Sequence, residues 1–364
     1  MADKEISLDE FETWLADGKE LAVLDIRDPA DVGYASPLFA TNLPAERLIK
    51  DIGRFIPRQV VRTVLIDDGT GVARRAAAGL EKEGRGNVVA LEGGIPAWLD
   101  RHGKEGGPTF DIPGVDFTLA VQREKGTPSI SAVELEDLRR TGADVVVIDT
   151  RTVAEFARDH VPGAVAVPGA ELLLRFKDVV PSADTKVVVS CAGLPRAILG
   201  AQTLIDARVP NEVSFLHDGT KAWTAAGFEL ESGQTRTYLA ASPAAREFSK
   251  GAISNLSEDD RIPEVDLPTA RLWSQDNGRT TYLLDVRTPE EYAERHLQGS
   301  ISSEGGQLLA VAYRTISVRG ARVVLVDDVS GVRARTVAHW LQRRGYELAI
   351  LLVDFESGFV SEVA

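Results

Sequence analysis

Three Asp-x-Arg triplets recur along the chain at intervals as long as a whole domain. The triplets are Asp25-Ile26-Arg27, Asp149-Thr150-Arg151 and Asp285-Val286-Arg287. The second aspartate lies 124 residues after the first, and the third lies 136 residues after the second. Each triplet follows a short helical pattern and ends an apolar, strand-like run. A period of this length exceeds that of solenoid repeats, so the sequence predicts three tandem copies of one domain.

Strand patterns and helical patterns alternate within each copy, which predicts the α/β class. We expect each copy to form a mainly parallel central sheet flanked by helices. The predicted domains are residues 1–105, 129–232 and 263–364, joined by linkers at 106–128 and 233–262. A helical pattern from Pro243 to Lys250 lies inside the second linker. The third copy stops soon after Gly358, so we expect either a truncated copy or a further segment beyond Ala364.

The charge balance narrows the range of partners. With 41 basic and 55 acidic side chains, the net charge of −14 disfavours nucleic acid and anionic membranes, since both need a positive face. An anionic small substrate would need a local positive site. The single cysteine excludes an internal disulfide or a paired-cysteine metal site and fits a reducing compartment. Because no signal-peptide pattern and no run of roughly 18 apolar residues occurs, we expect a soluble, cytoplasmic protein.

The cysteine lies where a strand pattern gives way to a helical pattern. The apolar run that begins at Val187 stops at Ser190, and helical periodicity resumes at Ala197, so we expect Cys191 on a strand-to-helix loop. A helix N-terminus and a nearby arginine can lower a thiol pKa to roughly 3.5–7.5, and we expect a lowered pKa here. The loop offers an anion cradle and a fixed positive charge. These groups are the backbone N–H groups of Ala192, Gly193 and Leu194, and the side chain of Arg196.

Several motifs surround this loop in a fixed order. They are Asp149-Thr150-Arg151, Glu155-Phe156, His160 to Pro168, Cys191 with Arg196 five residues later, and Asp218-Gly219 with Trp223. Together they resemble the rhodanese family, and the resemblance spans nearly the whole chain through the other two copies. It implies a small α/β domain, sulfur transfer through a cysteine persulfide, and no metal or organic cofactor. The family's loop resembles Cys-x-x-Gly-x-Arg, whereas Gly193 lies only two residues after the cysteine.

The outer copies carry aspartate where the middle copy carries cysteine. Counted from the first residue of each triplet, Asp68 and Asp328 lie 43 residues on and Cys191 lies 42 residues on, so we align these three. Aspartate cannot carry a sulfane sulfur, and its charge repels anionic donors. The two outer copies are therefore predicted to be inactive. The adjacent carboxylates of Asp67 and Asp68 point to opposite faces of a strand, which argues against a metal site.

The resemblance implies a thiosulfate sulfurtransferase with Cys191, Arg196, Arg151 and Asp149 as its catalytic residues. We expect Cys191 to take sulfur from a small anionic donor such as thiosulfate and pass it to cyanide, a thiol or a protein acceptor. Arg196 would bind the donor or the leaving sulfite. Arg151 would contact substrate or brace the loop, and Asp149 would orient its neighbours.

Three other interpretations stay open at this point. The chain could be a non-catalytic interaction or regulatory protein in which Cys191 is a buried apolar residue or a redox sensor. It could also be a cysteine-dependent phosphatase, although such enzymes hold phosphate within a Cys-x5-Arg loop that is one residue longer. Finally, Asp149 and Arg151 could form a purely structural ion pair.

Overall fold

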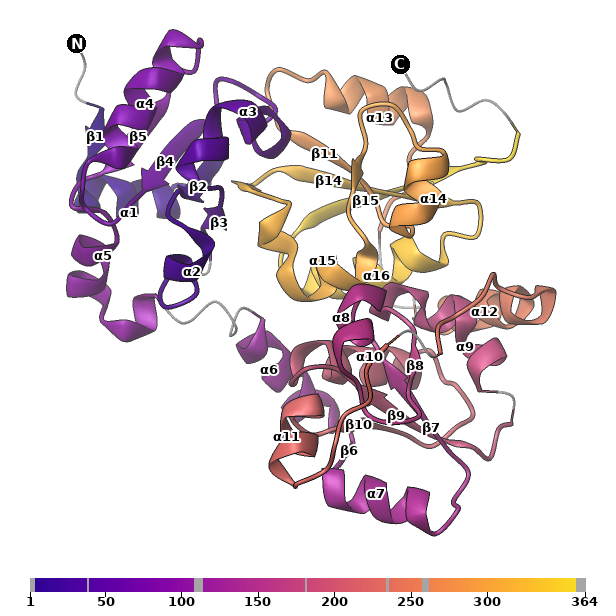
Figure 1. The fold of residues 1–364 in the computed structure, drawn as a ribbon. Coiled ribbons are helices and arrows are strands. Elements are labelled where there is room, and N and C mark those ends of the chain that lie inside the picture. The colour runs from indigo at the N-terminus through magenta and orange to yellow at the C-terminus, as the bar shows by residue number, and fades with distance from the viewer. Residues whose placement is uncertain are drawn as a thin grey trace. The chain divides into compact units, whose positions relative to one another are not determined.

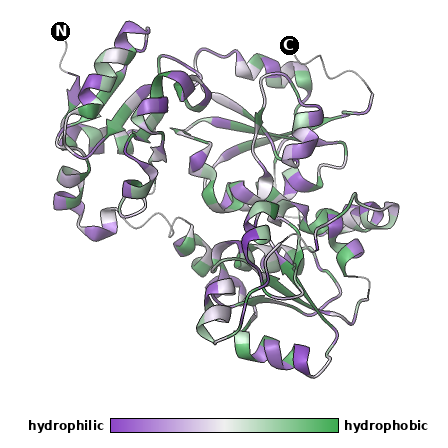
Figure 2. Ribbon diagram, in the orientation of Figure 1, coloured by the Kyte–Doolittle hydropathy of each residue, from purple (hydrophilic) through white to green (hydrophobic). Residues whose placement is uncertain are grey.

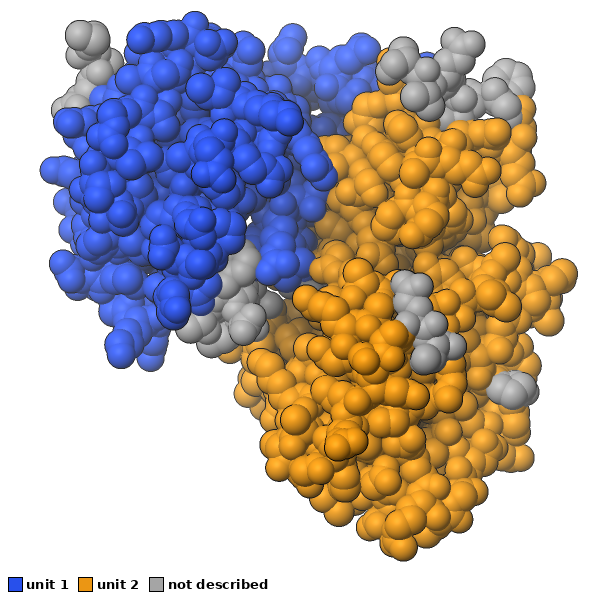
Figure 3. Space-filling model, viewed as in Figure 1, with its two compact units in different colours: residues 1–113, 271–282, 311–322 blue, residues 114–270, 283–310, 323–364 orange. Residues whose placement is uncertain are grey.

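The computed structural model describes residues 4–37, 39–107, 114–180, 182–233, 236–256 and 262–357. It contains three mainly parallel sheets flanked by helices, the architecture that the sequence predicts (Figure 1). The chain forms two compact units, coloured separately in Figure 3. One comprises residues 1–113, 271–282 and 311–322, and the other comprises residues 114–270, 283–310 and 323–364. The third copy contributes residues to both units, and the predicted domain boundaries stay predictions.

The first sheet has the strand order β1-β5-β4-β2-β13, with β3 beside β2. Its strands are β1 (Glu5–Ile6), β2 (Leu21–Asp25), β3 (Thr41–Asn42), β4 (Arg62–Ile66), β5 (Val88–Leu91) and β13 (Val318–Arg319). The helices along this stretch are α1 (Leu8–Ala16), α2 (Pro29–Val32), α3 (Ala45–Phe55), α4 (Val72–Lys82), α5 (Gly94–His102) and the 3-10 helix η1 (Lys104–Gly106). Strand β13 comes from the third copy and pairs antiparallel with β2.

The second sheet, with the order β6-β10-β9-β7-β8, is wholly parallel. Its strands are β6 (Ser129–Ile130), β7 (Val145–Asp149), β8 (Val165–Ala166), β9 (Lys186–Ser190) and β10 (Val213–Leu216). The helices here are α6 (Val115–Lys125), α7 (Ala132–Arg140), α8 (Val153–Arg158), η2 (Gly169–Glu171), α9 (Leu172–Val179), α10 (Pro195–Asp206), α11 (Gly219–Ala225) and α12 (Pro243–Leu256).

The third sheet has the order β12-β11-β14-β15. Its strands are β11 (Thr281–Asp285), β12 (Ile301–Ser302), β14 (Arg322–Asp328) and β15 (Glu347–Val353). The helices here are α13 (Leu267–Ser274), α14 (Pro289–Glu294), α15 (Gly305–Val311), η3 (Ala312–Arg314) and α16 (Val332–Arg343). The expected truncation of this copy concerns the chain after Ser357, which lies outside the described residues.

Apolar residues fill the centre of the second sheet because helices cover both of its faces. Val187, Val188 and Val189 of β9 are all buried, as is Phe215 of β10. In Figure 2 the hydrophobic colour follows these central strands. Trp223 is buried as well, with its indole N–H donating to the Glu229 carbonyl at 2.9 Å. The end of β9 is therefore a rigid platform for the loop that follows it.

The segments predicted as linkers contain two helices that pack on the second sheet's layer. Helix α6 occupies residues 115–125 of the 106–128 segment and lies against α10. Gly114 and Gly126, both with positive φ, bracket it, so the glycines that suggested a linker are helix-end residues. Helix α12 extends the predicted 243–250 helix to Leu256 and packs on α9. Residues 108–113, 234–235 and 257–261 of these linkers lie outside the described residues.

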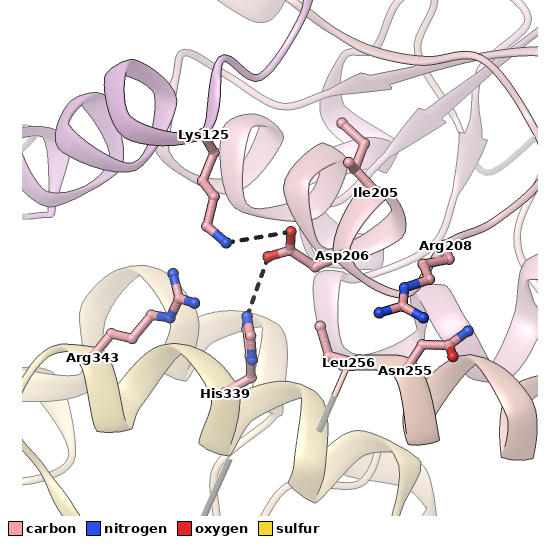
Figure 4. Close-up of a pocket in the computed structure, with 8 residues that line it drawn as sticks. All are labelled: Lys125, Ile205, Asp206, Arg208, Asn255, Leu256, His339 and Arg343. Carbon is pink, nitrogen blue, oxygen red and sulfur yellow. Dashed lines mark ion pairs between the residues drawn. The ribbon is translucent and has the colours of Figure 1, made fainter. Parts of the chain in front are cut away.

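Four helices of the second unit end around one pocket of about 240 Å³ (Figure 4). Lys125, Asp206, Leu256 and Arg343 are the last residues of α6, α10, α12 and α16. Asp206 pairs with Lys125 at 3.7 Å and with His339 at 3.4 Å. Cationic side chains at helix C-termini compensate the negative ends of the helix dipoles. The basic residues of this pocket therefore stabilise the helix ends that meet there.

None of the helices in the described part of the chain combines the length and the apolar character needed to cross a membrane.

Candidate active site

Cys191 is the first residue after β9 and lies before α10, on the strand-to-helix loop that the sequence predicts. In the parallel pairing of β7 with β9, Asp149 lies opposite Ser190, so Cys191 follows the last paired residue. Pro195 occupies the first turn of α10, where its missing N–H removes no needed donor. The cysteine is only 2% exposed. Its thiol therefore sits beneath the loop, at the carboxyl edge of the sheet.

Backbone groups from two helices hold this loop. The N–H of Gly193 donates to Cys191 Sγ at 3.4 Å, as expected for the cradle. The Leu194 carbonyl accepts the N–H of Ile198 at 3.0 Å, and Ala192 lies half-buried in the same loop. The roles of the Ala192 and Leu194 N–H groups in the cradle stay predictions. On the other side, the N–H of Thr220 donates to the Cys191 carbonyl at 3.0 Å.

Gly219 makes that close approach possible. A Cβ on Gly219 would lie 1.9 Å from the Cys191 carbonyl oxygen, and the backbone there has φ +51°. A side chain at this position would displace the loop. The start of α11 thus fixes the cysteine from outside the loop itself.

The expectation of a lowered thiol pKa is corrected by the structure. Burial raises the pKa of Cys191 above its ordinary value, although the charge of Arg196 and the N–H groups of Gly193 and Ala197 act in the opposite direction. Desolvation penalises the charged thiolate, and here it outweighs the helix N-terminus. The sequence pattern identifies the favourable groups but carries no information on how deeply the sulfur is buried.

Arg196 is already paired within the protein. Its two Nη atoms lie 2.7 Å from the two carboxylate oxygens of Glu155, the third residue of α8. Glu155 also accepts the N–H of Thr152 at 3.1 Å, which completes a capping box at the start of α8. Burial raises the pKa of Glu155, but the hydrogen bond and charge of Arg196 outweigh it and lower the pKa to about 2. The sequence analysis did not predict this ion pair between Arg196 and Glu155. The available signal was the capping-box spacing of Thr152 and Glu155, which places the glutamate at the start of α8.

Asp149 and Arg151 form a buried brace next to the loop. Arg151 Nε lies 3.0 Å from Asp149 Oδ1, and its Nη2 lies 2.8 Å from Oδ2. Its Nη1 lies 3.0 Å from Asp159. The triplets of the outer copies repeat this arrangement, with Arg27 on Asp25 and Arg287 on Asp285. A contact that recurs in copies without the cysteine favours the structural interpretation of Asp149 and Arg151.

Comparisons with known proteins assign the chain to a family. The sequence pattern described as "Rhodanese-like domain" matches residues 131–226 and 269–358, which is half of the chain. The chain belongs to the rhodanese-like domain family. The crystal structure of a thiosulfate sulfurtransferase from Pseudomonas aeruginosa is similar over 99% of this chain and 68% of that chain. The two share 39% identity with a TM-score of 0.91, so this rhodanese-like chain is built like a sulfurtransferase throughout.

A second relative is a regulator. An HTH-type transcriptional regulator of Mycobacterium tuberculosis is 30% identical over 119 residues, which cover 32% of this chain. The match covers 52% of that protein, so the chain spans about half the length of this curated relative.

The residues that take the place of the cysteine in the first and third copies are Asp67 and Asp327, which corrects the alignment with Asp68 and Asp328. In the β2–β4 pairing, Asp25 lies opposite Ile66, so Asp67 takes the place of Cys191. Asp67, Cys191 and Asp327 also lie the same 42 residues after the first residue of their triplets, whereas Asp68 and Asp328 lie one residue further on. The loop after Asp67 has one residue more than the loop after Cys191.

Hydrogen bonds confirm this equivalence. The Asp67 carbonyl accepts the N–H of Ile95 at 2.8 Å, as the Cys191 carbonyl accepts that of Thr220. Asp67 Oδ2 accepts the N–H of Ala73, and Asp327 Oδ2 that of Ala334, both at 2.9 Å. In the two loops without cysteine, a buried aspartate side chain therefore accepts the N–H at the start of the helix that follows.

Proposed function

We propose that this chain is a sulfurtransferase that moves a sulfane sulfur from thiosulfate or a similar donor to cyanide or a thiol acceptor through a persulfide on Cys191. The observation that carries the proposal is the position of the only cysteine. It lies at the carboxyl end of a central parallel strand, with a backbone N–H on its sulfur and an arginine in the first turn of the next helix. The similarity to a thiosulfate sulfurtransferase over 99% of the chain supports the same reaction class.

The proposed chemistry has two half-reactions. The Cys191 thiolate attacks the outer sulfur of thiosulfate, a new S–S bond forms, the old S–S bond breaks, and sulfite leaves with the bonding electron pair. Cyanide then attacks the outer sulfur of the persulfide, thiocyanate leaves, and the thiolate is restored. No electron enters or leaves the protein, so the cycle needs no redox cofactor. The N–H of Gly193 would stabilise the anionic sulfur, and Arg196 would attract the donor and hold the departing sulfite.

Thiocyanate formation from thiosulfate and cyanide tests this proposal. We expect parallel lines in double-reciprocal plots, the signature of a covalent intermediate, and no thiocyanate with Cys191→Ser. The matched control is Ser190→Ala, which alters the neighbouring buried residue and keeps the thiol. Turnover by Cys191→Ser, or intersecting lines with wild type, would refute a persulfide at this residue.

A non-catalytic binding or regulatory protein is the second candidate, and one observation favours it. Cys191 is buried with a raised pKa, and the charge of Arg196 is already paired with Glu155. In that case thiosulfate, mercaptopyruvate and a thiol persulfide would all leave the protein mass unchanged. A cytoplasmic, reducing location stays a prediction for both candidates.

A further inference from the structure

The second and third copies each contact the other through one side chain, and the two side chains come from equivalent positions. Glu171 lies at the end of η2 and Gln307 lies in α15, and they are 136 residues apart, as are Asp149 and Asp285. Glu171 is buried and accepts Arg333 Nη1 of the third copy at 3.2 Å. Gln307 Nε2 donates to Glu155 Oε2 of the second copy at 3.4 Å. Glu171 therefore contacts the loop arginine of the third copy directly, and Gln307 contacts the carboxylate that pairs with the loop arginine of the second copy.

The two loop arginines are equivalent but differ in their surroundings. Arg196 and Arg333 are the second residues of α10 and α16, and each pairs with its own capping-box glutamate, Glu155 or Glu291. Arg333 contacts three further carboxylates, those of Glu171, Asp327 and Asp328. Among the ion pairs given for the described residues, Arg196 has Glu155 alone. In place of a carboxylate equivalent to Glu171, the catalytic loop meets the neutral amide of Gln307.

We propose that Gln307 is a specificity-determining residue of the Cys191 loop, supplied by the inactive third copy. Its amide keeps a second carboxylate away from Arg196 and so preserves the attraction of the loop for anionic sulfur donors. The inference rests on the proposed function. A carboxylate at this position would lie beside Glu155 and cancel the remaining field of Arg196, as Glu171 does for Arg333.

The carboxylates that already surround the loop make this position sensitive. Burial raises the pKa of Glu304 to about 7, and the nearby charges of Glu171, Glu290 and Glu155 act in the same direction. Glu304 precedes α15, the helix that carries Gln307, and interacts with Arg196. The carboxylates around Glu304 thus already set up a negative field, and one more carboxylate beside Glu155 would strengthen it against an anionic ligand.

Alkylation of Cys191 measures this field without requiring sulfur transfer. Iodoacetate is anionic and iodoacetamide is neutral, so the ratio of their rates reports the electrostatic potential at the thiol. Because the chain has one cysteine, the mass of the intact protein counts the modification directly. The experiment uses the full chain at pH 8, with Gln307→Glu, Gln307→Lys and the control Glu171→Gln.

We expect Gln307→Glu to lower the iodoacetate-to-iodoacetamide ratio by roughly tenfold, and Gln307→Lys to raise it by a similar factor. The thiosulfate KM should move in the opposite direction to the ratio, with a smaller change in kcat. Glu171→Gln should change the ratio by less than either Gln307 variant, because the carboxylate that it removes is bound to Arg333.

Ratios for the two Gln307 variants within about twofold of wild type, or shifts of the same sign in both, would overturn the inference. If either variant fails to fold, the sign of the shift in the other still decides. Failure of wild type to take up sulfur from thiosulfate refutes the proposed function instead, and the alkylation ratio remains measurable. The two failures are thus distinct.

Discussion

Arg196 and Glu155 form a two-point ion pair, with both Nη–Oε distances at 2.7 Å, directly beside the loop of the single cysteine. The pair joins the first turn of α10 to the first turn of α8, two segments 41 residues apart in the sequence. It holds the arginine in one orientation before any substrate arrives. The Glu155 carboxylate also offsets the positive charge of Arg196. Glu155 therefore sets both the orientation of Arg196 and the strength of its attraction for an anion.

Removing the charge of Glu155 should lower the stability of the fold and strengthen the binding of the sulfur donor. We expect Glu155→Gln to lower the free energy of unfolding by about 1–2 kcal/mol, because the half-buried Arg196 loses its counter-charge. The freed arginine should lower the thiosulfate KM by roughly threefold. Thermal denaturation and steady-state kinetics measure the two effects. Glu291→Gln, the equivalent change in the third copy, should leave KM unchanged and cost less stability, because Arg333 keeps its other carboxylates. A raised KM in Glu155→Gln would contradict this account.

The pH dependence of Cys191 reactivity should reflect its burial. Because burial raises the thiol pKa, the thiolate is a minor species at pH 7 and its fraction grows as the pH rises. We expect the rate of alkylation by iodoacetamide to increase about tenfold per pH unit from pH 7 to pH 9. Mass spectrometry of the intact protein follows the reaction. A rate that levels off below pH 7 would mean that the helix N-terminus and Arg196 dominate instead.

Arg151 should behave as a brace and not as a substrate ligand. Lysine cannot reproduce the forked contacts to Asp149 and Asp159, so Arg151→Lys should reduce stability by about 2–4 kcal/mol. The kcat of the folded fraction should stay within about threefold of wild type. Arg287→Lys, the same change in the third copy, is the matched control for stability. A loss of kcat of about 100-fold at an unchanged melting temperature would make Arg151 a catalytic residue after all.

The correction from Asp68 to Asp67 predicts unequal effects of two neighbouring substitutions. Asp67 is buried and accepts the N–H groups of Gly69 and Ala73, both at 2.9 Å. Asp67→Ala should therefore destabilise the first unit by about 2–3 kcal/mol by leaving buried donors unpaired. Asp68 is exposed and bonds only within its own turn, so Asp68→Ala should cost less than about 1 kcal/mol. Equal losses in urea denaturation would restore the original alignment.

The sequence was sufficient for those features that depend on short-range pattern. The triplets, the strand before Cys191 and the early helical place of Pro195 all follow from periodicity and backbone chemistry within ten residues. The alignment of Cys191 with Asp68 was wrong although the count was available in the sequence, because Asp67, Cys191 and Asp327 each lie 42 residues after the first residue of their triplets. Strand register, a property of the folded sheet, resolves it.

Other features depend on contacts between segments that are distant in the sequence, and the sequence carries no decisive signal for them. Helix α6 begins and ends at glycines, which looked like linker residues until its packing against α10 was known. Strand β13 completes the first sheet from the third copy. The pairing of Arg196 with Glu155, and the approach of Gln307, require the positions of α8, α10 and α15 in space. The depth of burial that raises the pKa of Cys191 is set by the same packing.

The measurement that tests the central claim most directly is the mass of the intact protein after incubation with thiosulfate. This account predicts a gain of one sulfur atom per chain in wild type, release of one equivalent of sulfite, and loss of the added mass on treatment with cyanide. Cys191→Ser should gain nothing, whereas Glu291→Gln in the third copy should load as wild type does. A wild-type mass that stays unchanged with thiosulfate and mercaptopyruvate, without release of sulfite, would contradict the assignment of sulfur transfer to Cys191.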